Sequence, residues 1–131
     1  MKVRHKNCVR IVYLIILLQE FQKAYFKIDL SLFIITAYFN NPELRNKNII
    51  SVDWEKAAGH LNYFWSAQNT VIVGQYAGRV LGEILVNDLG ADPKLMHAWG
   101  FSLGGHFVGH LGRKLTETDR LKRKMARITG T

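Results

Sequence analysis

Hydrophobic and polar positions along the chain follow two different periods. Residues 26–31 alternate between apolar and polar, and the next four residues, 32–35, are all apolar. This pattern predicts a strand that begins half-exposed and ends buried. The polar segment 40–48, with the sequence NNPELRNKN, predicts a loop. The β-branched and apolar segment 49–54, IISVDW, predicts a second short strand.

A helical period dominates the second half of the chain. Between Thr70 and Leu89, apolar residues recur every three or four positions, which predicts one face of a helix of about five turns. Gly90 follows as a C-cap. After Ser102, large apolar residues recur every four positions and predict another helix. The two apolar faces are Val73, Tyr76, Ala77, Val80, Leu81, Ile84, Leu85 and Leu89 in the first helix, and Leu103, Phe107, Leu111 and Leu115 in the second.

The predicted order of elements indicates the fold class. It reads strand, strand, helix, strand, helix, with the segment ARIT at 126–129 as a last strand. Strands that alternate with helices form a mostly parallel sheet covered by helices, so the prediction is an α/β fold. A chain of 131 residues has room for one such domain.

The first residues resemble a targeting segment. A basic opening precedes an apolar run from Ile11 to Leu18, which is the layout of a secretory signal and is too short to span a bilayer. We therefore predict a signal peptide or anchor over residues 1–24, a domain over 25–131 and a secreted protein. The alternative is that the run is a buried helix or strand of the domain.

Charge and cysteine content narrow the classes of function. The net charge is +8, but the excess lies at the two ends, with four basic residues in 1–10 and seven in 113–127. Such runs are usually solvated surfaces, so no nucleic-acid partner is expected. One cysteine, Cys8, excludes an intrachain disulfide and a Cys-rich metal site. No metal and no cofactor are expected.

The pentapeptide GFSLG at 100–104 carries the strongest chemical signal. It lies between a predicted strand and a predicted helix, where a tight turn holds its serine, Ser102, above the sheet as a nucleophile. The Leu103 N–H at the start of the helix would favour an oxyanion. His106 and His110 lie on the same helix as Ser102, and we expect them to pack or to be partly exposed rather than to act as the base.

Four segments in a fixed order resemble the pancreatic lipase family, especially its insect lipases and phospholipases A1. They are NIISVDWEKAAG, AQNTVIVGQYAGRVLGEIL, HAWGFSLGGHFVGHLGRKL and ARITG, within residues 31–130. The resemblance implies an α/β-hydrolase fold and hydrolysis of lipid esters, by triacylglycerol lipase or phospholipase A1 activity. It also implies a lipid ester substrate at a membrane or lipid-droplet surface.

The resemblance assigns roles to individual residues. Ser102 matches the family's nucleophile, and Leu103 matches the residue whose N–H lines the oxyanion hole. The second oxyanion donor comes from the family's His-Gly-aromatic loop, which reads Thr36-Ala37-Tyr38 here. Tyr38 keeps the aromatic residue whose N–H would face the oxyanion, while Ala37 replaces the glycine. The family's triad Asp comes just after ITG and its His further on, whereas this chain ends at Thr131. We therefore expect a partial α/β-hydrolase fold that lacks its C-terminal half and is inactive alone.

Two other functions stay open at this point. One is a catalytically inactive lipid-binding or storage protein of the same fold. The other is a basic binding module in which the segment GRKLTETDRLKRKMAR, residues 112–127, contacts an anionic membrane or nucleic acid. No aromatic residue interleaves with this basic run, which is evidence against single-stranded nucleic acid as its ligand.

Overall fold

Four parallel strands form the sheet of this computed structural model, which describes residues 12–15, 30–43, 47–52, 54, 57 and 63–131. The order across the sheet is β2-β1-β3-β4, and every neighbouring pair is parallel. The predicted parallel sheet is confirmed. The strands are β1 (Val12–Ile15), β2 (Asn48–Ile50), β3 (His97–Gly100) and β4 (Arg127–Gly130).

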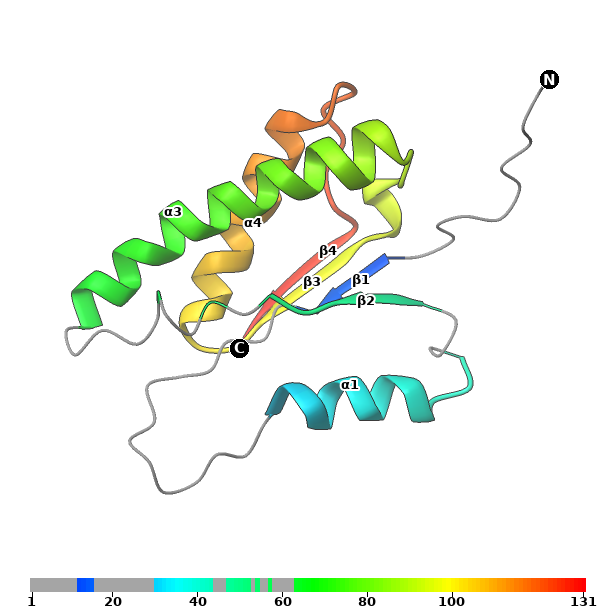
Figure 1. Ribbon diagram of the computed structural model, residues 1–131, viewed down its shortest axis with the longest axis horizontal. Coiled ribbons are helices and arrows are strands. Elements are labelled where there is room, and N and C mark those ends of the chain that lie inside the picture. The colour runs from blue at the N-terminus through cyan, green and yellow to red at the C-terminus, as the bar shows by residue number, and fades with distance from the viewer. Residues whose placement is uncertain (1–11, 16–29, 44–46, 53, 55–56, 58–62) are drawn as a thin grey trace.

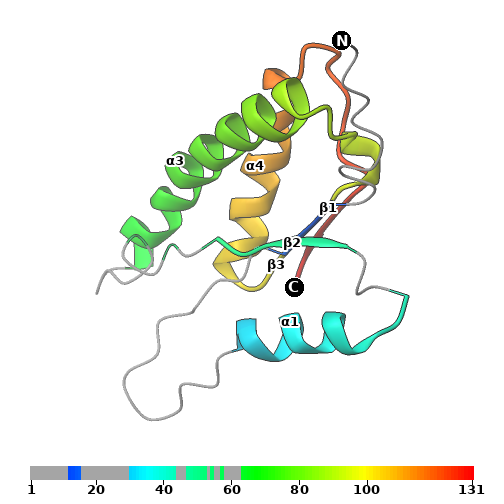
Figure 2. The ribbon, with the colours of Figure 1, turned by 45° about the vertical axis from the view of Figure 1, so that its right-hand side comes forward.

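Helices cover both faces of the sheet. α3 (Tyr63–Leu81) and α4 (Leu103–Thr118) lie on one face, and α1 (Leu30–Asn40) lies on the other, as Figures 1 and 2 show from two directions. α3 continues directly into the π-helical segment η1 (Gly82–Asp88). A short 3-10 turn, η2 (Pro93–Leu95), leads into β3. Within the described residues, no helix is both long and apolar enough to cross a membrane.

The prediction of a strand that ends at residues 32–35 is wrong. Residues 30–40 form α1, so the apolar run 32–35 is helical and the following residues, including Tyr38, continue the same helix. A short apolar run suits a buried helix as well as a buried strand, and periodicity alone does not separate the two. The loop predicted after it is confirmed for Asn41–Glu43, and the second strand is shorter than predicted.

The place of that strand in the sheet is taken by β1, which comes from the segment predicted to be a signal peptide or anchor. Val12, Tyr13 and Leu14 pair with β2, and Tyr13, Leu14 and Ile15 pair with β3. The prediction that residues 1–24 lie outside the domain is therefore wrong for Val12–Ile15, and the alternative, a strand of the domain, holds for these residues. A continuous apolar run is typical of a central parallel strand, because both of its faces are covered. Cleavage of a signal stays a prediction.

The contact between α3 and α4 is built from small residues. Five of them recur every four positions along α3 and η1, and all are buried: Ser66, Thr70, Gly74, Gly78 and Gly82. An added Cβ at Gly74 would lie 2.7 Å from the carbonyl oxygen of Phe107 and 3.0 Å from the Cβ of His110. The two helix backbones are therefore in direct contact. The predicted helix is confirmed and begins earlier, but three residues of its predicted apolar face, Tyr76, Ile84 and Leu89, are exposed.

The core lies between α4 and the sheet. Phe107, Leu111 and Leu115 of α4 are fully buried, which confirms three members of the predicted apolar repeat, and Val108 is buried beside them. The fourth member, Leu103, is only partly buried. One cluster joins α4 to β3 and to Trp54, and the Trp54 and Phe107 rings lie 5.5 Å apart between centroids. Burying side chains of this size stabilises the fold by about 2 kcal/mol each. The position of α4 over the sheet is therefore fixed by its buried face.

A buried carboxylate shapes the connection from α4 to β4. Asp119 ends α4 and accepts hydrogen bonds from the N–H groups of Leu121 and Arg123 at 3.1 and 2.9 Å. The Arg123 guanidinium also donates to Asp119, at 2.8 and 3.2 Å. The hydrogen bonds from Arg123, with those from the main chain, lower the pKa of Asp119 to about 2. This set of hydrogen bonds turns the chain back toward the start of β4.

Replacing Gly74 with alanine tests the close approach of the two helices. We expect Gly74→Ala to lower the free energy of unfolding by about 1–3 kcal/mol, because the added methyl group meets main-chain atoms of α4. Gly109→Ala is the matched control, since Gly109 is in the exposed part of α4 and an added Cβ meets nothing within 4 Å. That control gains up to about 1 kcal/mol from helix propensity. Denaturant unfolding measures both, and equal effects of the two substitutions would contradict the packing described here.

The pH dependence of stability tests the environment of Asp119. Its pKa is lowered from 3.8 to about 2, so the stabilisation is complete above about pH 4 and disappears as the pH falls from about 4 through about 2. We expect Asp119→Asn to lower the free energy of unfolding by about 2 kcal/mol at pH 7. The difference between the variant and the wild type should shrink toward zero over that pH window. Denaturant unfolding at a series of pH values measures it, and a difference that does not depend on pH would rule out this account.

Candidate active site

Ser102 occupies the turn between β3 and α4. Its backbone has φ 53° and ψ −121°, and it is one of two described non-glycine residues with positive φ. This conformation costs a residue with a side chain about 1–3 kcal/mol, and such strain clusters at functional sites. The predicted strand-to-helix turn at Ser102 is confirmed.

The glycine before Ser102, Gly100, is required by the close approach of α4 to β3. A Cβ added at Gly100 would overlap the carbonyl group of Gly104 and lie 2.9 Å from the nitrogen of Gly105. The first turn of α4 thus rests on the last residue of β3, and a larger residue at Gly100 would push the helix away. The turn is tight because Gly104 and Gly105 donate to the carbonyl oxygens of Phe101 and Ser102, at 2.8 and 2.9 Å.

The Leu103 N–H is the main-chain donor best placed for an anion. Leu103 is the first residue of α4, and its N–H makes no hydrogen bond with another described residue. The first N–H groups of a helix lack intrahelical acceptors, and the helix dipole adds partial positive charge there. The start of α4 therefore offers an unsatisfied donor next to the Ser102 side chain, which is the requirement for one half of an oxyanion hole.

The carboxyl end of β4 lies directly beside Ser102. Thr131 donates to the carbonyl of Gly100 at 3.0 Å, and Ser102 donates to the carbonyl of Thr131 at 2.6 Å. The end of β4 and the start of α4 come this close because Gly105 and Gly130 face each other, with an added Cβ at Gly130 only 2.9 Å from the Gly105 Cα. The strand that follows α4 thus ends at the candidate nucleophile.

No described residue is positioned as a general base. The Ser102 hydroxyl has no hydrogen-bond partner among the described residues. His106 is exposed, and His110 packs with its Cβ against Gly74, which confirms the expectation that both ride on α4. His97 lies at the amino end of β3, where its Nε2 lies 3.0 Å from the Thr129 Oγ1, and burial, followed by the charge of Arg127, lowers its pKa.

The described aspartates nearest before β3 and after α4 are occupied elsewhere. Asp92 caps η2 by accepting from the Lys94 N–H at 3.0 Å, and Asp119 lies at the far end of α4. Asp53 lies outside the described residues. The described part of the chain also contains no group of three or more His, Cys, Asp or Glu side chains that could hold a metal ion.

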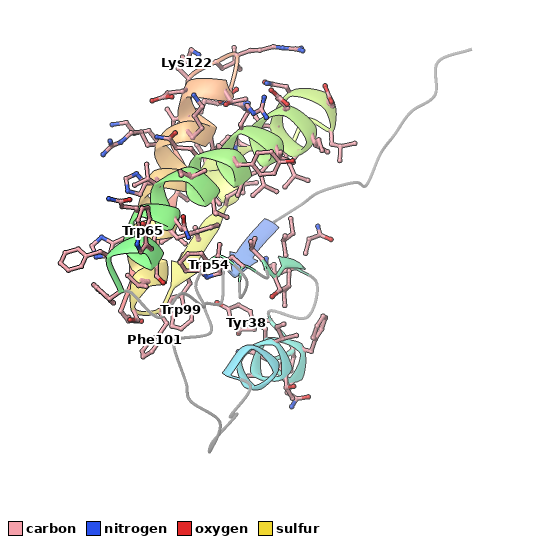
Figure 3. All side chains as sticks on the ribbon, turned by 60° about the vertical axis from the view of Figure 1, so that its left-hand side comes forward. Tyr38, Trp54, Trp65, Trp99, Phe101 and Lys122 are labelled. Carbon is pink, nitrogen blue, oxygen red and sulfur yellow. The ribbon has the colours of Figure 1, made fainter. Side chains whose placement is uncertain are left out.

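Tyr38 does not occupy a loop. It lies within α1, where a main-chain N–H points along the helix axis toward the carbonyl four residues earlier. In this arrangement the helix uses the N–H that was predicted to be the second oxyanion donor. Figure 3 places Tyr38 on α1, across the sheet from α3 and α4. Its role at the oxyanion hole stays a prediction.

Aromatic residues gather at the end of the molecule that holds Ser102. The rings of Trp99 and Phe101 stack with centroids 6.4 Å apart, on the strand and turn just before Ser102. Trp65, at the start of α3, lies at the same end (Figure 3). Sequence reasoning did not single out these residues. The three consecutive aromatic residues 63–65, all of which are exposed, could have indicated this aromatic cluster from the sequence.

Comparison with known proteins identifies relatives of this chain. A model of the Lipase family matches residues 13–131. Over 88 residues, which is 67% of this chain, the protein is 34% identical to pancreatic lipase-related protein 2 of Rattus norvegicus and 35% identical to pancreatic triacylglycerol lipase of Oryctolagus cuniculus. It is 34% identical over 68 residues, or 52% of this chain, to lipase member H of Danio rerio.

The match covers a limited part of these relatives. It spans 17% of the length of the first two proteins and 14% of the third. The family match nevertheless includes all four strands of the sheet apart from the first residue of β1, together with the turn that holds Ser102. The chain belongs to the pancreatic lipase family.

Proposed function

We propose that this protein is a carboxylic ester hydrolase that acts on lipids and that Ser102 is its nucleophile. The observation that carries the proposal is the backbone of Ser102, held at positive φ between a parallel strand and a helix. This conformation raises a serine hydroxyl above the carboxyl edge of a sheet, where a substrate carbonyl can approach it. In the proposed reaction, the Ser102 oxygen attacks the ester carbonyl carbon while a base accepts its proton, and the bond to the alcohol oxygen breaks as that proton passes to the leaving alcohol. Water then hydrolyses the acyl-enzyme, which releases the carboxylic acid and restores the serine hydroxyl.

The Leu103 N–H is the proposed oxyanion donor. It has no other partner among the described residues and lies at the positive end of the α4 dipole. A donor of this kind is worth about 3–4 kcal/mol of transition-state stabilisation in serine hydrolases. We retain Tyr38 as the proposed second donor, which requires the chain around it to leave the helical conformation that it has here.

Activity also requires a base to accept the serine proton. No described histidine or carboxylate contacts Ser102, and loss of the base in a comparable triad costs on the order of a millionfold in rate. The carboxyl end of β4 lies beside Ser102, so residues that follow this strand in a longer protein would enter the site directly. We therefore propose that the 131-residue chain is inactive alone and that the triad acid and histidine belong to a C-terminal part of the enzyme.

The substrate class is proposed at the level of lipid esters, either triacylglycerol or phospholipid cleaved by phospholipase A1 activity, at a membrane or lipid-droplet surface. The names of the relatives include a pancreatic triacylglycerol lipase, which supports the first of these. We also propose a secreted location. The second candidate function is a catalytically inactive lipid-binding or storage protein of the same fold. It is favoured by the absence of a partner for the Ser102 hydroxyl among the described residues.

A chimeric enzyme separates the two functions. Residues 97–131 would replace the matching segment of the Oryctolagus cuniculus pancreatic triacylglycerol lipase, which supplies the remaining residues of an enzyme. We expect the chimera to hydrolyse a chromogenic short-chain ester and Ser102→Ala to lower that rate by at least about a thousandfold. The 131-residue chain itself should hydrolyse the ester no faster than its own Ser102→Ala variant.

The control is the thermal unfolding of the chimera and its Ser102→Ala variant, which should agree because the hydroxyl makes no hydrogen bond with a described residue. A folded chimera without Ser102-dependent turnover would favour the inactive lipid-binding protein. Ser102-dependent turnover by the 131-residue chain would show instead that a base lies within it. Triacylglycerol and phosphatidylcholine emulsions, given to the active chimera, then compare the two substrate classes for this turn.

A further inference from the structure

The turn after α4 presents a concentrated positive charge around one apolar side chain. Residues 120–124 have the sequence RLKRK, and we call them the basic loop. Arg120, Lys122 and Lys124 are exposed, and Leu121 is 72% exposed between the first two. A leucine side chain this exposed buries little apolar surface and therefore contributes little to the stability of the fold. The exposed side chains of the basic loop, Arg120, Leu121, Lys122 and Lys124, therefore combine charge and apolar surface without an evident role in stability.

One of the four cations of the basic loop is neutralised and the others are not. Arg123 turns inward to Asp119 at 2.8 Å and lies 3.7 Å from Asp92. No described carboxylate forms an ion pair with Arg120, Lys122 or Lys124. Three positive charges thus face solvent without a counter-charge. The Lys122 ammonium contacts the main-chain carbonyl of Glu117, which holds its side chain but leaves its charge.

Hydrogen bonds fix the main chain of the basic loop. Asp119 accepts from the Leu121 and Arg123 N–H groups, and Asn87 accepts from the Arg120 N–H at 3.1 Å. Asn87 also donates to the carbonyl of Thr118 at 3.0 Å, so the end of η1 braces the end of α4. A loop that is ordered before it binds loses less entropy on binding than a flexible one. The outward side chains are therefore displayed on a preorganised support.

We propose that the basic loop docks this protein onto an anionic lipid surface, with Arg120, Lys122 and Lys124 on the headgroups and Leu121 among the acyl chains. The cations complement the negative charge of such a surface, where each contributes about fivefold to binding. A polyanionic glycan or nucleic acid would attract the same cations but would offer no apolar environment to Leu121. The exposed leucine is thus the observation that favours lipid over these polyanions.

The basic loop lies at the opposite end of α4 from Ser102. α4 has 16 residues, which corresponds to a length of about 24 Å. Figure 3 shows Lys122 at one end of the molecule and Trp99 and Phe101 at the other. Docking through the basic loop would therefore leave the turn at Ser102 away from that lipid surface. The proposed docking is separate from ester hydrolysis and does not depend on it.

Co-sedimentation with lipid vesicles tests the docking surface. We expect the 131-residue chain to bind vesicles of equimolar phosphatidylcholine and phosphatidylserine and not to bind vesicles of phosphatidylcholine alone. Arg120→Gln/Lys124→Gln should weaken binding about 25-fold. The matched control, Arg79→Gln/Arg113→Gln, removes the same charge from exposed positions outside the basic loop and should weaken binding less than about threefold. Leu121→Ser should weaken binding severalfold, Leu121→Trp should strengthen it, and Ser102→Ala should leave it unchanged.

Three results would overturn the proposal. The first is equal weakening by the two charge-removing double variants, which would mean that only the net charge matters. The second is equal binding to both kinds of vesicle. The third is binding to a heparin fragment or duplex DNA that exceeds vesicle binding and does not change with Leu121→Ser, which would identify the basic loop as a polyanion site. Circular dichroism of each variant checks that the fold is retained.

Discussion

The first turn of α4 touches the ends of two strands, and the candidate site depends on this contact. Glycine meets backbone at both places, with Gly100 beneath Gly104 and with Gly105 against Gly130. Any side chain at these points would separate the helix from the sheet. Because the helix begins so close to β3, the chain has only Phe101 and Ser102 in which to reverse direction above the strand, and the strained conformation falls on Ser102. Its positive φ is the consequence of that limit.

The same contact brings together three features of the proposed hydrolase site. It places Ser102 at the carboxyl edge of the sheet and leaves the Leu103 N–H without an acceptor among the described residues. It also brings the end of β4 to this turn, where Thr131 accepts a hydrogen bond from the Ser102 N–H and donates one to the Gly100 carbonyl. The other end of α4 has a different character. There the buried Asp119 pairs with the partly exposed Arg123 and turns the chain, and cations without an ion pair among the described residues face solvent. The helix thus separates the site of proposed chemistry from the proposed docking surface.

The local parts of this arrangement could be predicted from sequence, while the nonlocal parts could not. A strand, Gly-x-Ser-x-Gly and an amphipathic helix are contiguous, so the turn at Ser102 follows from neighbouring residues alone. Two apolar runs, 12–15 and 32–35, could each have formed the strand between β2 and β3. Only the pairing across the sheet shows that residues 12–15 form it. The contact of α3 with α4 does not follow from the period of large apolar residues, because it is made by small ones, Gly74 and Gly78 among them.

Backbone strain at Ser102 is the most direct measure of the central claim, which is that close packing of α4 forces this residue into its turn. Glycine adopts positive φ freely, whereas alanine keeps the Cβ and therefore the strain. Ser102→Gly should raise the free energy of unfolding by about 1 kcal/mol relative to Ser102→Ala, after allowing for the greater entropy of unfolded glycine. Denaturant unfolding of the two variants under identical conditions gives this difference. A glycine variant no more stable than the alanine variant would contradict the strained turn and, with it, the placement of Ser102 as a nucleophile.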